Sequence, residues 1–236
     1  MNSIAIRYVL IALLVLLLAP PTLFAHHGKD FAVTETAKLP EPKNFWLLLS
    51  GDFGSEEQLN NENTVIEFTP GILYGISNSL AFEVHPHFTE EEQGEFAYEA
   101  IGFQLRYNFS YLSDRFDFGF ASEYEISSKS EQENLVDLRF IISSETGKYK
   151  FALNAGFEFE KETSFVARLG VGSEITDNHS FAIELLSKFG DETNIDIIPS
   201  WTYETKYEHA LRIGLGFSMD KERPRISFRS ILIFSL

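Results

Sequence analysis

Apolar and polar residues alternate along most of this chain with a period of two. Residues 149–160 show it clearly, because Phe151, Leu153, Ala155 and Phe157 alternate with positions that are largely polar. Successive side chains of a β-strand point to opposite faces of a sheet, so this segment predicts a strand with one apolar and one polar face. About twelve such segments follow one another after the N-terminal region, without a convincing helical period between them. The pattern predicts an all-β protein.

Clusters of turn-forming residues, such as those at 77–79 and 145–148, separate the predicted strands. No linker and no sequence repeat interrupts the series, so we predict a single domain over residues 43–236. Ten or fourteen strands remain alternatives, because Glu99 breaks the alternation unless its strand contains a bulge. The predicted strands span residues 43–53, 63–76, 80–88, 96–109, 116–126, 134–143, 149–159, 164–175, 181–189, 194–203, 208–219 and 225–236.

The N-terminal region has the features of an export signal. Arg7 supplies a positive charge, and residues 9–19 form an apolar run that is short for a membrane-spanning helix. We therefore predict a signal peptide over residues 1–25, with a retained membrane anchor as the alternative. Residues 26–42 are polar and contain prolines. They form either a periplasmic lead-in or a plug of the domain that follows, and the sequence leaves both open.

Composition and charge exclude several classes of protein. The 236 residues carry a formal net charge of −16 without a basic stripe, which argues against nucleic-acid binding. The 23 Phe and 9 Tyr are too many for a disordered chain. The chain has no Cys, which excludes disulfides and a lipid-modified cysteine. Its mean hydropathy is close to zero, as expected of a membrane barrel in which only alternate residues face lipid.

The connections between strands favour a membrane barrel over a soluble sandwich or lipocalin-like barrel, which would show the same alternation with its apolar face inside. In an even-stranded barrel with periplasmic termini, the odd-numbered connections lie outside. They sum to a formal charge of −11, whereas the even-numbered ones sum to −1. Long polar surface loops and short periplasmic turns are typical of outer-membrane barrels. We therefore predict a transmembrane, antiparallel, up-and-down β-barrel of about twelve strands.

The last predicted strand resembles the C-terminal assembly signal of outer-membrane barrel proteins. Phe228, Leu232, Phe234 and Leu236 lie on one of its faces, although this signal usually ends in an aromatic residue rather than leucine. The HHGKDF sequence at 26–31 and the overall layout are similar to uncharacterised exported barrel proteins of Gram-negative bacteria. This resemblance implies a place in the outer membrane, contact with its lipid, and recognition by the barrel-assembly machinery.

If the apolar face meets lipid, the polar face lines a charged lumen, where hydration or pairing makes the charges tolerable. About twelve strands lie between filled eight-stranded barrels and open porins. The leading function is passage of small polar solutes or ions through a narrow, porin-like channel. The alternative is a non-conducting structural or interaction barrel with acidic surface loops. The charges expected inside are Glu67, Glu83, Asp117, Arg106, Asp137, Arg139, Arg168, Arg212 and Arg229.

Glu83, His85 and His87 share one face of a predicted strand. Two imidazoles and a carboxylate suit zinc, copper or nickel. Neighbours on one strand face are about 7 Å apart, so all three bind one ion only if the strand bends. A bulge at Pro86, which cannot donate a ladder hydrogen bond, would supply that bend. The alternative is three hydrated polar side chains, and we expect no cofactor elsewhere.

Aromatic residues gather near the predicted periplasmic strand ends, where a barrel meets lipid headgroups. The expected girdle contains Trp46, Tyr74, Phe109, Trp201 and Tyr203.

An outer-membrane hydrolase is a weaker alternative. Asp177, His179 and Ser180 have the residue types of a catalytic triad. Near neighbours in a tight turn cannot adopt the geometry of nucleophile, base and orienting group. Turn formation explains these residues, and we predict a protein without enzymatic activity.

Overall fold

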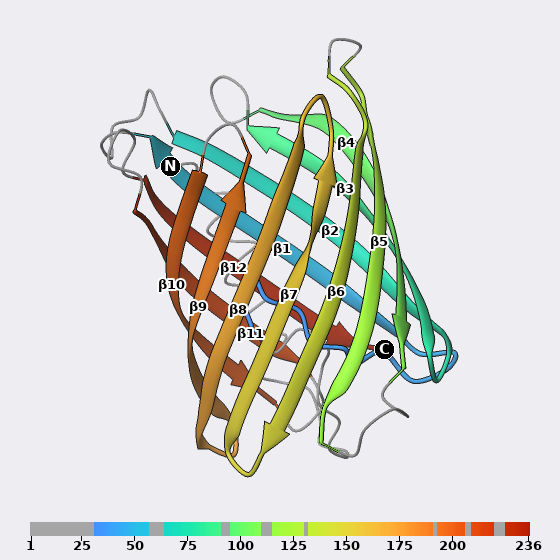
Figure 1. Ribbon diagram of the computed structural model, residues 1–236, viewed down its shortest axis with the longest axis vertical. Helices are drawn as coiled ribbons and strands as arrows, with labels where there is room; N and C mark the ends of the chain where they lie inside the picture. The colour runs from blue at the N-terminus through green and yellow to red at the C-terminus, as the bar shows by residue number, and fades with distance from the viewer. Residues whose placement is uncertain are drawn as a thin grey trace.

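The computed structural model describes residues 31–56, 64–90, 95–109, 115–129, 132–190, 193–205, 209–219 and 225–236. Over these residues the chain forms one closed antiparallel barrel, in which each strand pairs with its sequence neighbours and β1 pairs with β12 (Figure 1). This confirms the predicted fold class. The strands of the described residues are β1 (Phe45–Glu56), β2 (Thr64–Ser77), β3 (Leu80–Glu90), β4 (Phe96–Asn108), β5 (Asp117–Ser127), β6 (Leu135–Thr146), β7 (Tyr149–Phe159), β8 (Thr163–Thr176), β9 (His179–Phe189), β10 (Thr193–Glu204), β11 (Ala210–Ser218) and β12 (Arg225–Ser235).

The strand ends follow the turn chemistry closely. Gly147, between β6 and β7, has a φ of 60°, a left-handed conformation that glycine adopts without steric cost. The short turns at 78–79, 147–148 and 177–178 and the C-terminus lie at the lower end of the barrel in Figure 1, and the connection between β7 and β8 lies at the upper end. In the described part of the chain, no helix is long and apolar enough to cross a membrane. The predicted signal peptide, residues 1–25, lies outside the described residues.

The break in alternation at Glu99 is a β-bulge. His87 pairs with Ala100, whereas Phe88 pairs with Tyr98, so Glu99 is one extra residue in β4. The bulge restores the alternation, and twelve strands close the barrel.

The bulge predicted at Pro86 itself is not found, because Pro86 pairs in register with Ile101. The irregularity begins at the next step along β3, after His87. The extra residue is supplied by the opposite strand, β4, so the pairing of Pro86 stays regular.

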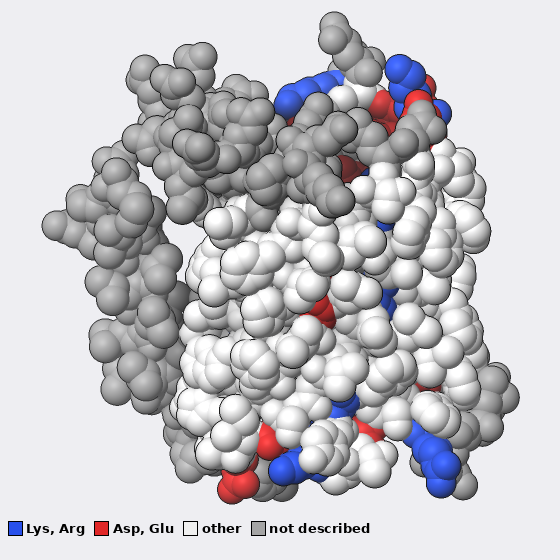
Figure 2. Space-filling view, turned by 60° about the vertical axis from the view of Figure 1, so that its left-hand side comes forward, with Lys and Arg blue, Asp and Glu red and all other residues white. Residues whose placement is uncertain are grey.

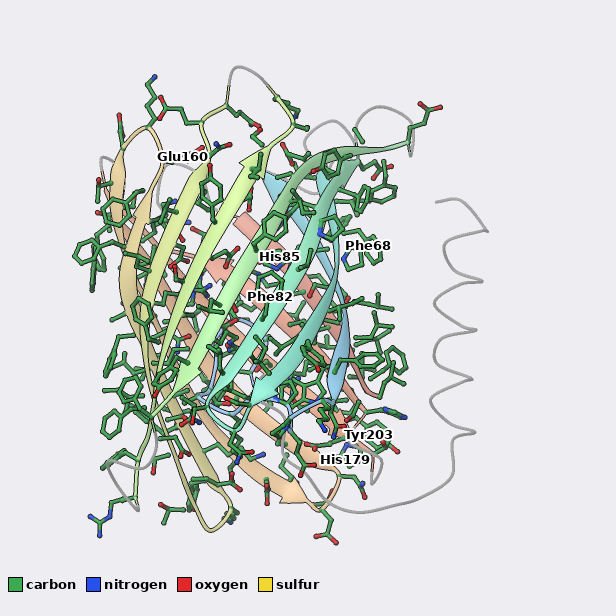
Figure 3. All side chains as sticks on the ribbon, turned by 90° about the vertical axis from the view of Figure 1, so that its right-hand side faces the viewer. Phe68, Phe82, His85, Glu160, His179 and Tyr203 are labelled. Atoms are coloured by element: carbon green, nitrogen blue, oxygen red, sulfur yellow. The ribbon has the colours of Figure 1, made fainter. Side chains whose placement is uncertain are left out.

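The outward face of the barrel is apolar and rich in aromatic side chains. Phe82, Leu105 and Phe157 are 36%, 46% and 48% exposed. Figure 2 shows a broad band with few charged atoms between two charged ends, and Figure 3 shows Phe68 on the outside of the barrel. An apolar belt of this extent is unfavourable in water but matches the hydrocarbon layer of a membrane.

The girdle prediction is wrong for Trp46. Its side chain is only 4% exposed and lies inside the barrel, where it packs with Leu48, Leu73, Ala210 and Ile233. Residues 45–49 are all apolar, so neither face of this part of β1 can be recognised from the sequence. An apolar side chain does not indicate the lipid face there, because the interior is itself apolar at this end of the barrel.

Candidate functional site

The charges predicted to face the lumen are either buried or line cavities in the interior. Arg106, Arg212, Arg139, Glu83 and Asp137 are each at most 4% exposed. The other predicted lumen charges, which are less buried, line cavities in the interior: Glu67, Arg229, Arg168 and Asp117.

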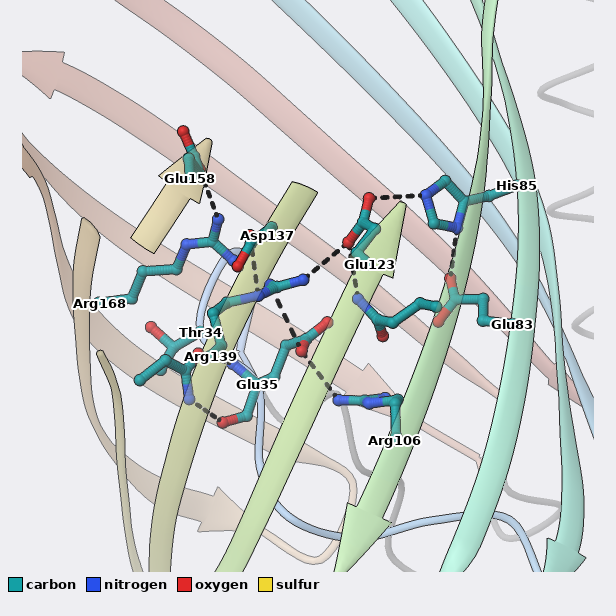
Figure 4. Close-up of polar contacts among 12 residues, drawn as sticks. Thr34, Glu35, Glu83, His85, Arg106, Glu123, Asp137, Arg139, Glu158 and Arg168 are labelled. Atoms are coloured by element: carbon teal, nitrogen blue, oxygen red, sulfur yellow. Dashed lines mark hydrogen bonds and ion pairs between the residues drawn. The ribbon is translucent and has the colours of Figure 1, made fainter. Parts of the chain in front are cut away.

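A stretch of the chain before β1 occupies the lumen. Residues 31–38, here called the internal segment, run inside the barrel without joining its wall (Figures 1 and 4). Phe31 is 2% exposed, Thr34 1% and Ala37 3%. Of the two alternatives for residues 26–42, the described part from residue 31 onward has the position of a plug.

Glu184 of β9 anchors the start of this segment. Its carboxylate accepts hydrogen bonds from the backbone N–H groups of Ala32, Val33 and Thr34 at 2.7, 2.8 and 2.9 Å. The hydroxyl of Ser200 donates a fourth, at 2.8 Å. Glu184 is 0% exposed, so these four hydrogen bonds replace the hydration that its carboxylate loses on burial. The sequence places Glu184 on the lumen face, but nothing distinguishes it there from other acidic residues.

Side chains from the barrel wall also satisfy the backbone further along the segment. The N–H of Glu35 donates to Asn154 Oδ1, and Asn154 Nδ2 donates to the carbonyl of Glu35, both at 2.7 Å. Asn108 Nδ2 donates to the carbonyl of Ala37, while the N–H of Ala37 donates to Ser143 Oγ. Buried backbone groups need such partners, and side chains provide them where no ladder exists.

Glycines of the wall make room for the segment. A Cβ atom at Gly170 would lie 2.8 Å from the ring of Phe31, and one at Gly214 would lie 3.1 Å from the Cβ of Ala32. Such lumen-facing glycines are the sequence signal of a close approach by another part of the chain. The sequence alone does not say which part approaches.

Glu35 carries the segment's charge into a network of arginines (Figure 4). One of its carboxylate oxygens lies 3.1 Å from Arg106 and 3.5 Å from Arg139. Arg139 also contacts Glu123 at 2.8 Å and Asp137 at 3.0 Å. A single network of paired charges therefore joins the segment to β4, β5 and β6.

The two lumen histidines lie at the edge of this network. His85 Nε2 on β3 is 3.0 Å from Glu123 Oε1 on β5, across the intervening β4, and Glu83 Oε1 is 3.6 Å from His85 Nδ1. Ligand atoms of His85, His87 and Glu123 lie within 4.8 Å of one another. The structure thus groups Glu123, rather than the predicted Glu83, with the histidines. Glu83 lies at the Nδ1 side of the His85 ring, whereas Glu123 lies at its Nε2 side.

The lumen between the segment and the upper end contains cavities. One of about 310 Å³ is bounded below by Ala32, Val33 and Glu35. Another of about 670 Å³ is lined by rim residues that include Glu160 and Lys161. On the other side of the segment, the cavity beside Thr36 and Lys38 has only about 10 Å³, room for about one water molecule.

Aromatic side chains also mark the lower end of the barrel. Trp201 stacks against Tyr203 and against the ring of His179, whose centroid is 5.6 Å from that of Trp201. Tyr74 is 42% exposed, and Phe109 contacts Phe118. Of the turn residues that suggested a triad, Asp177 is in the turn and His179 begins β9.

Several solved outer-membrane barrels have similar structures. A KdgM porin in complex with disordered oligogalacturonate has a TM-score of 0.62 at 11% sequence identity, covering 81% of this chain and 99% of that one. An outer-membrane channel from Pseudomonas putida F1 has a TM-score of 0.58 at 12% identity, covering 89% and 100%. Outer membrane phospholipase A from Escherichia coli has 0.51 at 11% identity, covering 88% and 98%. No family model matches the chain, and no curated protein matches it in sequence. At these identities, the similarity shows the fold.

Proposed function

We propose that the protein is an outer-membrane channel for small polar solutes or ions, and that the internal segment closes it. The observation that carries this proposal is the cavity of about 310 Å³, which has a charged wall and the segment as its floor. A barrel that served only as a scaffold would not need a polar cavity above a segment that closes the lumen. Charged walls of this kind orient and select polar solutes.

The mode of docking supports a closure that can open. The segment is held by polar contacts to Glu184, Asn154 and Ser143 and by ion pairs of Glu35. Water or a polar solute that enters the lumen competes for such contacts. The strands, in contrast, are closed by ladder hydrogen bonds around the whole barrel, so the wall persists when the segment leaves.

The fold and the surface support the location. The barrels named above include a porin and a channel, and the outer face of this barrel is an apolar belt. Phe228 and Leu236 of the C-terminal region are 39% and 59% exposed. They lie where membrane lipid contacts the barrel, and β12 is the strand we propose for recognition by the assembly machinery.

A reversible cross-link tests the closure. A Cβ atom at Gly119 would lie 3.2 Å from the Cβ of Ala37, close to the separation of about 3.5–4.5 Å found in disulfides. The chain contains no Cys, so only the intended pair forms in an Ala37→Cys, Gly119→Cys variant. We expect the oxidised variant to be silent in planar bilayers and to conduct in discrete steps after reduction. The single Ala37→Cys variant is the control and should not respond to oxidant.

A chain without residues 31–38 separates the channel from its alternatives. It should conduct continuously. If it folds, as judged by heat-modifiable migration on a gel, and remains silent, the protein is a non-conducting barrel. The phospholipase among the similar structures makes a hydrolase the next candidate to assay, with phospholipid vesicles as substrate.

A further inference from the structure

Two histidines and a glutamate meet in the lumen above the internal segment. His85 and His87 belong to β3 and Glu123 to β5, with β4 between them. Figure 3 shows His85 inside the barrel, and Figure 4 shows its ring directed at Glu123. We propose that His85, His87 and Glu123 bind one divalent transition-metal ion of the zinc, copper or nickel class. The proposal concerns binding and does not depend on whether the barrel conducts.

The strand between β3 and β5, β4, has a glycine at the point where the imidazole of His85 crosses it. His85 pairs with Gly102, and a Cβ atom there would lie 2.1 Å from His85 Nε2. The ring therefore occupies the space that any other residue would fill with its side chain. This arrangement brings Nε2 to 3.0 Å from Glu123 Oε1, although β3 and β5 are not neighbours. The gap is one that a metal ion with bonds of about 2.0–2.2 Å enters after small side-chain rotations.

Each ligand has a second polar residue behind it. Glu83 faces His85 Nδ1 at 3.6 Å, and the hydroxyl of Thr69 lies 3.3 Å from His87 Nδ1. Both rings consequently direct Nε2 toward the site. Gln104 and Arg139 bind the other oxygen of Glu123, each at 2.8 Å. Carboxylates and hydroxyls behind histidine ligands are a regular feature of metal sites, where they fix the ring and its tautomer.

A fourth donor and the local charge favour a cation. Glu125 Oε2 is 3.3 Å from His87 Nε2, and it lines a cavity of about 260 Å³ beside His87. Glu67, Glu99 and Glu133 line the same cavity. Two imidazole nitrogens with one or two carboxylates select borderline metals, whereas magnesium and calcium prefer sites composed entirely of oxygen ligands.

The test is metal binding by the full-length mature chain, refolded in detergent. Zinc affinity is measured by competition with a chromophoric chelator, and the ligands are identified from the nitrogen hyperfine splitting in the electron paramagnetic resonance spectrum of the copper-loaded protein. His26→Ala and His27→Ala are introduced together in all samples, so that the N-terminal imidazoles do not contribute. We expect one ion per chain, two imidazole nitrogens, and no competition by millimolar magnesium.

Two substitutions disrupt the site in different ways. His87→Gln deletes a ligand, and Gly102→Ala deletes none but displaces the ring of His85. Each should weaken zinc binding by about tenfold or more, the range seen when metal sites lose their supporting geometry. Gly54→Ala and His179→Gln are the controls, because Gly54 has open space around its Cβ position and His179 stacks on Trp201 at the lower end. Wild-type affinity in folded His87→Gln, or no zinc binding by the folded parent chain, would overturn the proposal.

Discussion

The carboxylate of Glu184 accepts a hydrogen bond from the backbone N–H of Ala32 at 2.7 Å, although 152 residues separate the two. The contact joins the internal segment, which precedes β1, to a lumen-facing side chain of β9. It is independent of the side chain at position 32, since the donor belongs to the backbone. The wall therefore recognises the path of the segment and not only its side chains, and the carboxylate is the group on which docking most depends.

Replacing that carboxylate should release the segment. Glu184→Gln keeps the shape but removes the charge and turns an NH₂ group toward backbone donors. Hydrogen bonds to charged groups contribute about 1.5–3 kcal/mol, so we expect docking to weaken by an amount in that range. In planar bilayers the variant should conduct more often than the parent chain. Glu158→Gln is the matched control, because Glu158 pairs with Lys188 and Arg168 instead of the segment. If the two variants opened equally often, Glu184 would not be the anchor of the internal segment.

The ion pair between Glu35 and Arg106 predicts coupling between segment and wall. Arg106 is 1% exposed, so Glu35→Ala leaves a buried guanidinium with less compensating charge. Removing one partner of a buried pair costs about 3–5 kcal/mol. The double variant with Arg106→Ala should lose less than the sum of the two single variants. Urea unfolding from lipid vesicles measures all three, and strict additivity would show that the two residues do not interact.

The sequence predicted the barrel because alternation is a local property that every strand displays. It predicted twelve strands despite Glu99, since one bulge repairs the parity. It could not predict that Trp46 faces inward, because residues 45–49 are apolar on both faces. It also could not pair Glu184 with Ala32 or His85 with Glu123, since these contacts depend on strand tilt and on which glycines the segment crosses. Local periodicity contains no information about contacts across the lumen.

Thiol labelling tests which face meets lipid. Phe157 is 48% exposed on the outer face, while its neighbour Glu158 lines the lumen cavities. In vesicles, Phe157→Cys should resist a membrane-impermeant maleimide, and Glu158→Cys should react. Both should react once the protein is unfolded in urea, which controls for the reagent. The reverse pattern in the folded protein would assign the apolar face to the interior.

The acidic cavity beside β1 and β2 should make the open channel selective for cations. Asp52 and Glu67 line a cavity of about 290 Å³ whose basic residue is Arg229. Acidic walls attract cations, an effect that salt screens over about 10 Å at 0.1 M. In the chain without residues 31–38, the reversal potential across a potassium chloride gradient should indicate cation preference. Asp52→Asn with Glu67→Gln should shift it toward zero, whereas Asp177→Asn, in the exposed turn at the opposite end, should not. A reversal potential that the lumen substitutions leave unchanged would mean that ions do not pass these carboxylates.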